Sequence, residues 1–97
     1  MKAEEVIKRY DEGQRDFQDV KLQGVNIKGI NLRAAKLTGA DLECADLTDA
    51  NLRGIDLQHA NLKGAILKGT DLYLADLRGA NLRDINLEGA NLKDTIF

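Results

Sequence analysis

The sequence predicts an all-β solenoid, in which short extended segments and turns wind into stacked coils. Three observations predict this fold. From residue 15 to residue 97 the chain reads in blocks of five, with no insertion or deletion. Leu stands at the centre of fourteen of the seventeen blocks. Gly, Asp and Asn recur at fixed places around each centre, where they favour turns.

A period of five excludes both a regular helix and a flat strand. Five residues of α-helix advance about 140° beyond a full turn, so the Leu side chains would scatter around the whole helix. In a flat strand, residues five apart point to opposite faces. The pattern is satisfied if each block is a short extended piece followed by a turn. The centre then points inward together with the residue two before it, which is Ala in nine of the seventeen blocks.

The first fourteen residues predict a short helix that caps the solenoid. Within residues 3–12 the spacing of Val6, Ile7 and Tyr10 places these side chains on one side of a helix. Gly13 is suited to end that helix. A solenoid needs such a cap because its terminal coil exposes core side chains and unpaired backbone. A detachable helix that binds a partner is the alternative.

Composition excludes several classes of protein. The chain has 97 residues, a formal net charge of −2 and one Cys, so it has no intrachain disulfide and no multi-Cys zinc site. No apolar run is long enough to cross a membrane. The acidic start of the sequence is unlike a secretory signal. We therefore expect a cytoplasmic protein.

The blocks resemble a known family. Runs such as ADLTDANLRG (45–54) and GANLRDINLEGANLKD (79–94) are similar to those of pentapeptide-repeat proteins. The stretch YDEGQRDF (10–17) also resembles the lead-in of small bacterial members, notably those abundant in cyanobacteria. The resemblance implies a right-handed quadrilateral parallel β-helix, with four blocks in each square coil. Residues 15–97 would then form about four coils, in a rod about 20 Å tall.

The residues that could support catalysis or metal binding all have a structural explanation. Cys44 and His59 both stand two residues after a centre, at outward corners too far apart to form a nucleophile pair. Asp occurs six times directly before a centre, but Asn takes the same position seven times. A position that accepts either residue uses their shared ability to bond the backbone rather than their charge. We expect no enzyme activity, no cofactor and no metal.

One column of exposed side chains is a candidate docking surface. With four blocks in each coil, Arg33, Arg53, Tyr73 and Lys93 stack above one another, with Leu74 at the adjoining corner. Arg and Tyr are common at interface hot spots. The column predicts a docking strip for an acidic protein partner. The alternative is a solvated column in which long side chains cover the backbone.

The last coil is the other candidate surface. Leu82, Leu87 and Leu92 would leave one side of this coil open unless something covers it. Ile96 occupies a position that is usually Asp or Asn, which predicts burial. Either Phe97 folds over the end as a plug, or the end self-associates in a homodimer or a stack. The family resemblance implies the second possibility, because some members dimerise through C-terminal coils.

These features predict a non-enzymatic protein-interaction or scaffold module, and a pure spacer role stays open. The resemblance also offers an alternative, a DNA mimic that modulates a type II topoisomerase. Duplex DNA of 20 Å would carry on the order of 12 negative charges. The repeat region holds twelve acidic and eleven basic residues. The near-neutral balance disfavours DNA mimicry and nucleic-acid binding.

Overall fold

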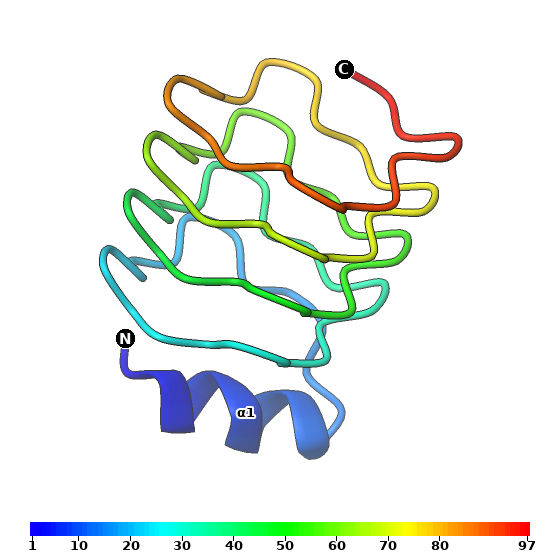
Figure 1. Ribbon diagram of the computed structural model, residues 1–97. Helices are drawn as coiled ribbons and strands as arrows, with labels where there is room; N and C mark the ends of the chain where they lie inside the picture. The colour runs from blue at the N-terminus through cyan, green and yellow to red at the C-terminus, as the bar shows by residue number, and fades with distance from the viewer.

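The computed structural model describes the whole chain, Met1–Phe97, as a stack of coils with a single helix, α1 (Ala3–Asp11), beneath the first coil (Figure 1). Residues 20 apart pair through thirteen parallel β-bridges, from Asp16↔Lys36 to Asp76↔Ile96. The bridges recur every five residues, so each coil has four sides. They are isolated bridges rather than continuous strands, because a turn interrupts every block after three residues. The right-handed winding implied by the family resemblance stays a prediction.

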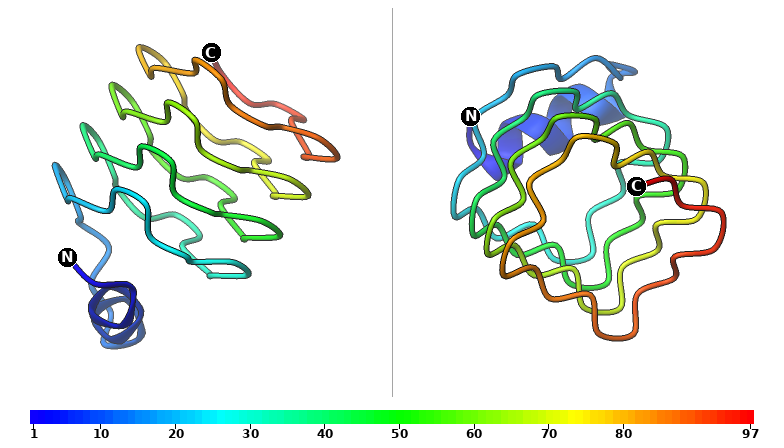
Figure 2. Two further views of the ribbon diagram at one scale, coloured as in Figure 1. Left: turned by 60° about the vertical axis from the view of Figure 1, so that its left-hand side comes forward. Right: turned by 90° about the horizontal axis from the view of Figure 1, so that it is seen from above.

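Each corner is a tight turn with one left-handed residue. The N–H of the residue three after a centre donates to the carbonyl of that centre, as from Ala50 to Leu47 at 3.0 Å. The residue two after the centre has positive φ in all sixteen blocks where it exists, and eight of these residues are Gly. Gly suits this conformation because it has no Cβ to clash. The view along the stack in Figure 2 shows the corners of successive coils in register.

The Asp and Asn residues before the centres have the predicted structural role. In all thirteen cases the side-chain Oδ1 accepts a hydrogen bond from the backbone N–H two residues later, as from Tyr73 to Asp71 at 3.1 Å. Asn61 makes the same bond as Asp71, so the interaction does not need a charge. These side chains hold the corners in place.

The interior is a solid apolar core. The centres of the first three coils and the residues two before them are nearly all buried, with Leu alternating with Ala or Ile. Thr70 is the one buried polar residue, and its hydroxyl donates to the Leu47 carbonyl at 2.7 Å. A dry, filled interior leaves no internal cavity for chemistry, so any function must use the outer surface or the two ends.

Helix α1 closes the base of the first coil. Val6 is fully buried, and Ala3 and Tyr10 are partly buried against the core. Gly13, with φ of +100°, follows the helix and turns the chain toward the first coil. Ile7 corrects the prediction from spacing, because its side chain is 45% exposed. It follows Val6 by about 100° around the helix and lies at the edge of the apolar stripe. No helix of the structure is long and apolar enough to span a membrane.

The last coil is open. Leu82 and Leu87 are half-buried, whereas Ile96 is 50% exposed and Phe97 is 59% exposed. The predicted burial of Ile96 is therefore wrong, because the residue before a centre projects outward whatever its type. The plug formed by Phe97 stays a prediction, because the exposed outer side of this ring is compatible with a ring that lies over the end of the core.

Candidate functional site

The residues of the candidate docking strip lie on the fourth side of the solenoid. The β-bridges Asn31↔Asn51, Asn51↔Asp71 and Asp71↔Asn91 align the four coils of this side. Two residues after each of these positions stand the side chains of the predicted column. Four of the five predicted residues, Arg33, Arg53, Tyr73 and Leu74, surround one shallow hollow of about 210 Å³, together with Ala34 and Gly54. Lys93 lies one coil beyond and does not line it.

Arg53 and Tyr73 form the middle of the strip. The Arg53 guanidinium lies over the Tyr73 ring, 4.7 Å from the ring centroid, which is a cation–π geometry. Its Nε is 3.6 Å from an Asp71 carboxylate oxygen. Asn91 also donates to Asp71, at 3.2 Å. These contacts hold Arg53 against the ring, so the pair presents one preorganised cationic and aromatic unit.

Arg33 forms the lower end of the strip, next to the cap. Its carbonyl accepts a hydrogen bond from the Tyr10 hydroxyl at 2.7 Å, which ties the fourth side to α1. The Arg33 guanidinium makes no ion pair, unlike that of Arg53. Arg33 is therefore the uncommitted positive charge at the hollow, and the side chain best placed to meet an external carboxylate.

Leu74 is the unusual member of the strip. It has φ of +62° and a side chain that is 55% exposed. The left-handed conformation costs roughly 1–2 kcal/mol for a residue with a Cβ. Leu74 therefore carries a conformational cost and exposes apolar surface. A Gly at this corner would avoid both.

The corner above Leu74 is also exceptional. A corner side chain reaches toward the Cβ position of the corner 20 residues later, as His59 does toward Gly79 and Asp49 toward Gly69. In every other pair of successive corners in a column, at least one of the two residues is Gly. Leu74 is followed in its column by Asp94, and the bond from its N–H to the Lys93 carbonyl lengthens to 3.2 Å.

The other charged side chains of the repeat serve its turns. The Arg78 guanidinium donates to the Asp76 carboxylate, with Nη2 and Oδ2 2.7 Å apart, which lowers the pKa of Asp76 and raises that of Arg78. A hydrogen bond from the Thr48 hydroxyl lowers the pKa of Asp46, and the backbone N–H of Gln18 lowers that of Asp16. These shifts stabilise ionised turn residues and do not indicate catalysis.

The residues considered for chemistry lie apart on the surface. Cys44 is a free, exposed thiol, and His59 is exposed at another corner. No group of three or more His, Cys, Asp or Glu side chains is placed to hold a metal ion.

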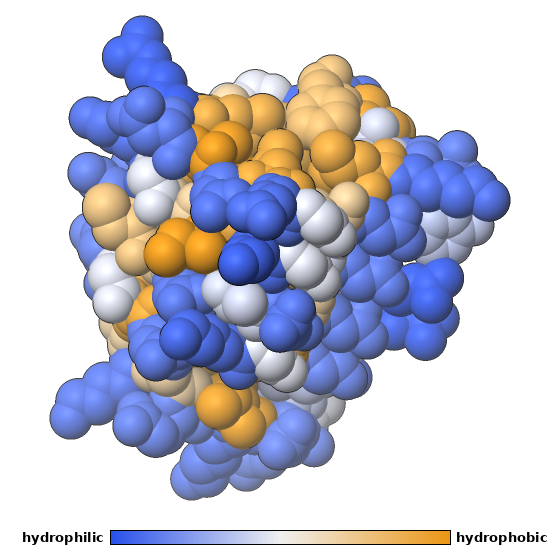
Figure 3. Space-filling model, in the orientation of Figure 1, coloured by the Kyte–Doolittle hydropathy of each residue, from blue (hydrophilic) through white to orange (hydrophobic).

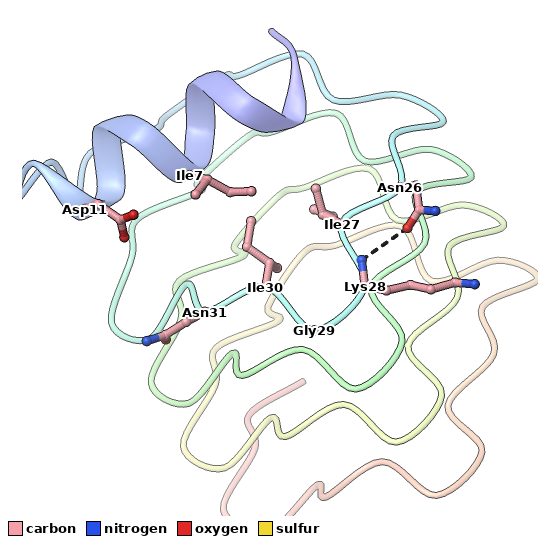
Figure 4. A pocket seen from close by; sticks show the side chains of 8 residues that line it. All are labelled: Ile7, Asp11, Asn26, Ile27, Lys28, Gly29, Ile30 and Asn31. Atoms are coloured by element: carbon pink, nitrogen blue, oxygen red, sulfur yellow. Dashed lines mark hydrogen bonds between the residues drawn. The ribbon is translucent and has the colours of Figure 1, made fainter.

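A second hollow, which the sequence did not predict, lies between α1 and the first coil. It has a volume of about 510 Å³ and is lined by Ile7, Asp11 and residues 26–31. Figure 4 shows Ile7, Ile27 and Ile30 directed into it, with Asp11 and Asn31 at one end. Only an exposed Ile7 could have indicated this hollow from the sequence. Helical spacing instead assigned Ile7 to the core.

The last coil brings together the other predicted surface. Leu82, Leu87, Leu92, Ile96 and Phe97 all belong to it, and the last three are exposed. Figure 3 shows apolar surface gathered at the top of the molecule, over this coil. The N–H groups of Leu82, Leu87 and Leu92 donate to no acceptor within the chain. The structure therefore presents an apolar face with an open backbone edge.

The fold defines the class of protein: a four-sided repeat solenoid with a filled apolar core. The model of pentapeptide repeats matches eight copies across residues 16–54 and 55–94. The chain belongs to the pentapeptide-repeat family.

Solved structures with this fold include proteins from cyanobacteria and a plant. A pentapeptide repeat protein from Nostoc PCC 7120 is 42% identical with a TM-score of 0.90, over 92% of this chain and 74% of that one. A pentapeptide repeat protein of the Arabidopsis thaliana thylakoid lumen is 29% identical with a TM-score of 0.76, over 84% and 60%. HetL of Nostoc, described as involved in heterocyst differentiation regulation, is 37% identical with a TM-score of 0.52, over 98% and 44%. No functionally curated protein matches the sequence.

Proposed function

We propose that this protein is a non-enzymatic interaction module that docks an acidic segment of a partner protein on the strip of Arg33, Arg53, Tyr73, Leu74 and Lys93. The observation that carries the proposal is the hollow that four of these side chains surround. It combines two guanidinium groups with an aromatic ring and an exposed aliphatic side chain. Arg and Tyr are among the side chains most enriched at binding hot spots.

The positive charges on the strip favour a partner segment with acidic side chains. Arg33 is free to pair with a carboxylate, and Lys93 adds a positive charge one coil away. An apolar side chain that follows the acidic residue would rest against Tyr73 and Leu74. Coils that pair rigidly along their length keep these groups fixed before binding, which lowers the entropic cost of association.

The alternatives have less support. The repeat region has nearly balanced charge, unlike a mimic of duplex DNA. A spacer would use none of the surface features of the strip, and Leu74 in particular would be more stable as Gly. The regulatory role described for HetL is compatible with an interaction module.

We also propose that the last coil self-associates with a second copy of the chain. The observation that favours it is the apolar face of Leu92, Ile96 and Phe97 beside unpaired backbone donors. The lateral dimensions of the molecule, 23 × 22 Å, bound this face to on the order of 500 Å² per partner, below the roughly 800 Å² of a standard interface. We therefore expect a weak dimer whose population depends on concentration.

A capture experiment with matched variants tests the docking proposal. The baits are the wild-type chain, Arg53→Glu/Tyr73→Ala, and a control that places the same charge change on another side, Arg83→Glu. Lysate of the source organism supplies candidate partners, and light scattering reports the mass of each bait. A partner held by wild type and Arg83→Glu but lost by the double variant supports the strip. Equal capture by all three baits contradicts it.

The chemistry of the partner is tested separately. A captured protein is divided into synthetic peptides, and each peptide is measured by fluorescence anisotropy at two salt concentrations. We expect an acidic peptide to bind, more weakly at higher salt. Binding by basic or uncharged peptides alone contradicts the proposed complementarity.

A further inference from the structure

The hollow at the base of the solenoid has an open backbone edge as one wall. On the upper side of residues 26–31, the next coil satisfies this edge: Ile27 donates to Asp46 at 2.9 Å, and Gly29 donates to Thr48 at 2.8 Å. On the lower side, the N–H groups of Asn26 and Asn31 donate to no acceptor in the chain. The carbonyls of Asn26 and Lys28 accept no hydrogen bond there.

The other three sides of the first coil differ, because the N-terminal segment bonds to each of them. The terminal amine of Met1 donates to Lys21 at 2.7 Å. The Tyr10 hydroxyl donates to Arg33, and the Gln14 amide donates to Asp16, both at 2.7 Å. The N-terminal segment, residues 1–14, therefore bonds to three sides and leaves the third side, centred on Ile27, without a partner.

The chain itself shows what kind of segment fits such an edge. Between coils, the residue two before a centre accepts a hydrogen bond from the coil above, and the centre and the residue two after it donate to that coil. Below residues 26–31, a parallel extended segment in this register would accept from Asn26 and Asn31. It would donate to the carbonyls of Asn26 and Lys28. Four hydrogen bonds would thus span six residues of the incoming segment.

The walls of the hollow add side-chain selectivity. The central residue of the incoming segment would point inward, toward Ile7, Ile27 and Ile30 (Figure 4). The Asp11 carboxylate lies at the Asn31 end and makes no ion pair. A basic side chain at the end of the segment would therefore find a complementary charge.

We propose that the hollow between α1 and residues 26–31 binds an extended segment of a partner protein as an added strand, with an apolar side chain against Ile7 and a basic one beside Asp11. Pairing of an extended peptide with an open sheet edge draws affinity from main-chain bonds and specificity from side-chain pockets. The volume of about 510 Å³ lies within the range of ordinary ligand pockets. This site is separate from the strip of the proposed function and does not depend on it.

A titration of the full, isotope-labelled chain tests the proposal by nuclear magnetic resonance. The probe is the capped peptide Ala-Asn-Leu-Lys-Gly-Ala-Lys, whose first six residues repeat positions 60–65 of this chain. We expect saturable shifts at the amides of residues 26–31 and at Ile7. Slower hydrogen exchange at Asn26 and Asn31 would report the new hydrogen bonds directly.

Matched controls separate pairing in the hollow from adhesion to the surface. Methylation of the Leu nitrogen of the peptide removes one hydrogen bond, and Ile7→Glu places a charge in the hollow. Each change should weaken binding by about tenfold. Ile66→Glu alters an isoleucine of similar exposure on a side of the solenoid and should leave binding unchanged. Arg53→Glu/Tyr73→Ala should bind the peptide like wild type, which separates this result from the fate of the strip.

Three results would overturn the proposal. The first is the absence of saturable shifts. The second is a set of shifts centred on the last coil, which would mean that the peptide joins any open edge. The third is that the amides of residues 26–31 shift with the concentration of the protein alone, which would assign the hollow to a second copy.

Discussion

The two ends of the solenoid differ in how far their terminal coils are covered. Both terminal coils have an apolar interior and a row of backbone groups without a neighbouring coil. At the N-terminal end α1 buries Val6, and residues 1–14 together satisfy one carbonyl on each of three of the four sides. At the other end Leu92 and Phe97 stay exposed, and the centre amides have no acceptor. The comparison teaches that a short N-terminal segment covers most of a terminal coil, and that the side it leaves open keeps unpaired backbone groups.

The largest expected effect contrasts the middle of the stack with its open end. Leu52→Asp buries an unpaired charge in a filled core, at a cost of at least about 4 kcal/mol, and should unfold the domain. Leu92→Asp changes the equivalent centre two coils above on the same side, where Leu92 is 37% exposed, and should cost about 1 kcal/mol or less. Urea denaturation followed by circular dichroism measures both. Equal losses would show that the last coil is closed in solution.

The next effect removes part of the N-terminal cap. Tyr10→Phe deletes the hydroxyl that donates to the Arg33 carbonyl, and it should destabilise the protein by about 1 kcal/mol. Tyr73→Phe is the control, because no hydrogen bond of the Tyr73 hydroxyl is present. Hydrogen exchange should accelerate in the first coil of Tyr10→Phe and not in the last. Uniform acceleration would show that the cap and the coils open as one unit.

A smaller effect, of opposite sign, is expected on the strip. Leu74→Gly relieves the left-handed conformation, and the exposed side chain gives up little packing, so the protein should gain up to about 1 kcal/mol. The same change should weaken capture of the partner on the strip. Thermal unfolding and the capture assay measure the two results. A variant that loses stability would mean that Leu74 packs as a structural residue.

The repeat predicts most of the fold because the same residue types recur at the same positions of every block. Leu centres, small residues two before them, and Asp or Asn at turns recur often enough that their roles follow from spacing alone. The strip was also predictable, since residues 20 apart must stack once the coil length is known.

The hollow was not predictable from the sequence, because it depends on where α1 crosses the first coil. Helical spacing placed Ile7 in the core, whereas the crossing leaves it at the edge. The prediction that Ile96 is buried assumed that an apolar side chain indicates burial. The backbone of the repeat instead directs every residue before a centre outward.

The smallest expected effect is the response of stability to acid. Hydrogen bonds from Arg78, Thr48 and Gln18 lower the pKa of Asp76, Asp46 and Asp16 in the folded protein. A carboxylate with a lowered pKa stabilises the fold above its unfolded pKa of about 3.9, and that contribution is lost as the pH falls through the folded pKa. Stability should therefore decline below about pH 4.

Asp76→Asn tests this response at one corner. The amide keeps the turn bond, as Asn61 does in the wild-type chain, but it loses the charge that faces Arg78. The variant should be slightly less stable than wild type at pH 7, and the difference should shrink as the pH falls through the lowered pKa of Asp76. Asn86→Asp, which adds a carboxylate at the same position of another block, serves as the reverse control. Urea unfolding at pH 7 and pH 3 measures the difference, and a constant gap between the curves would assign the loss to packing instead of charge.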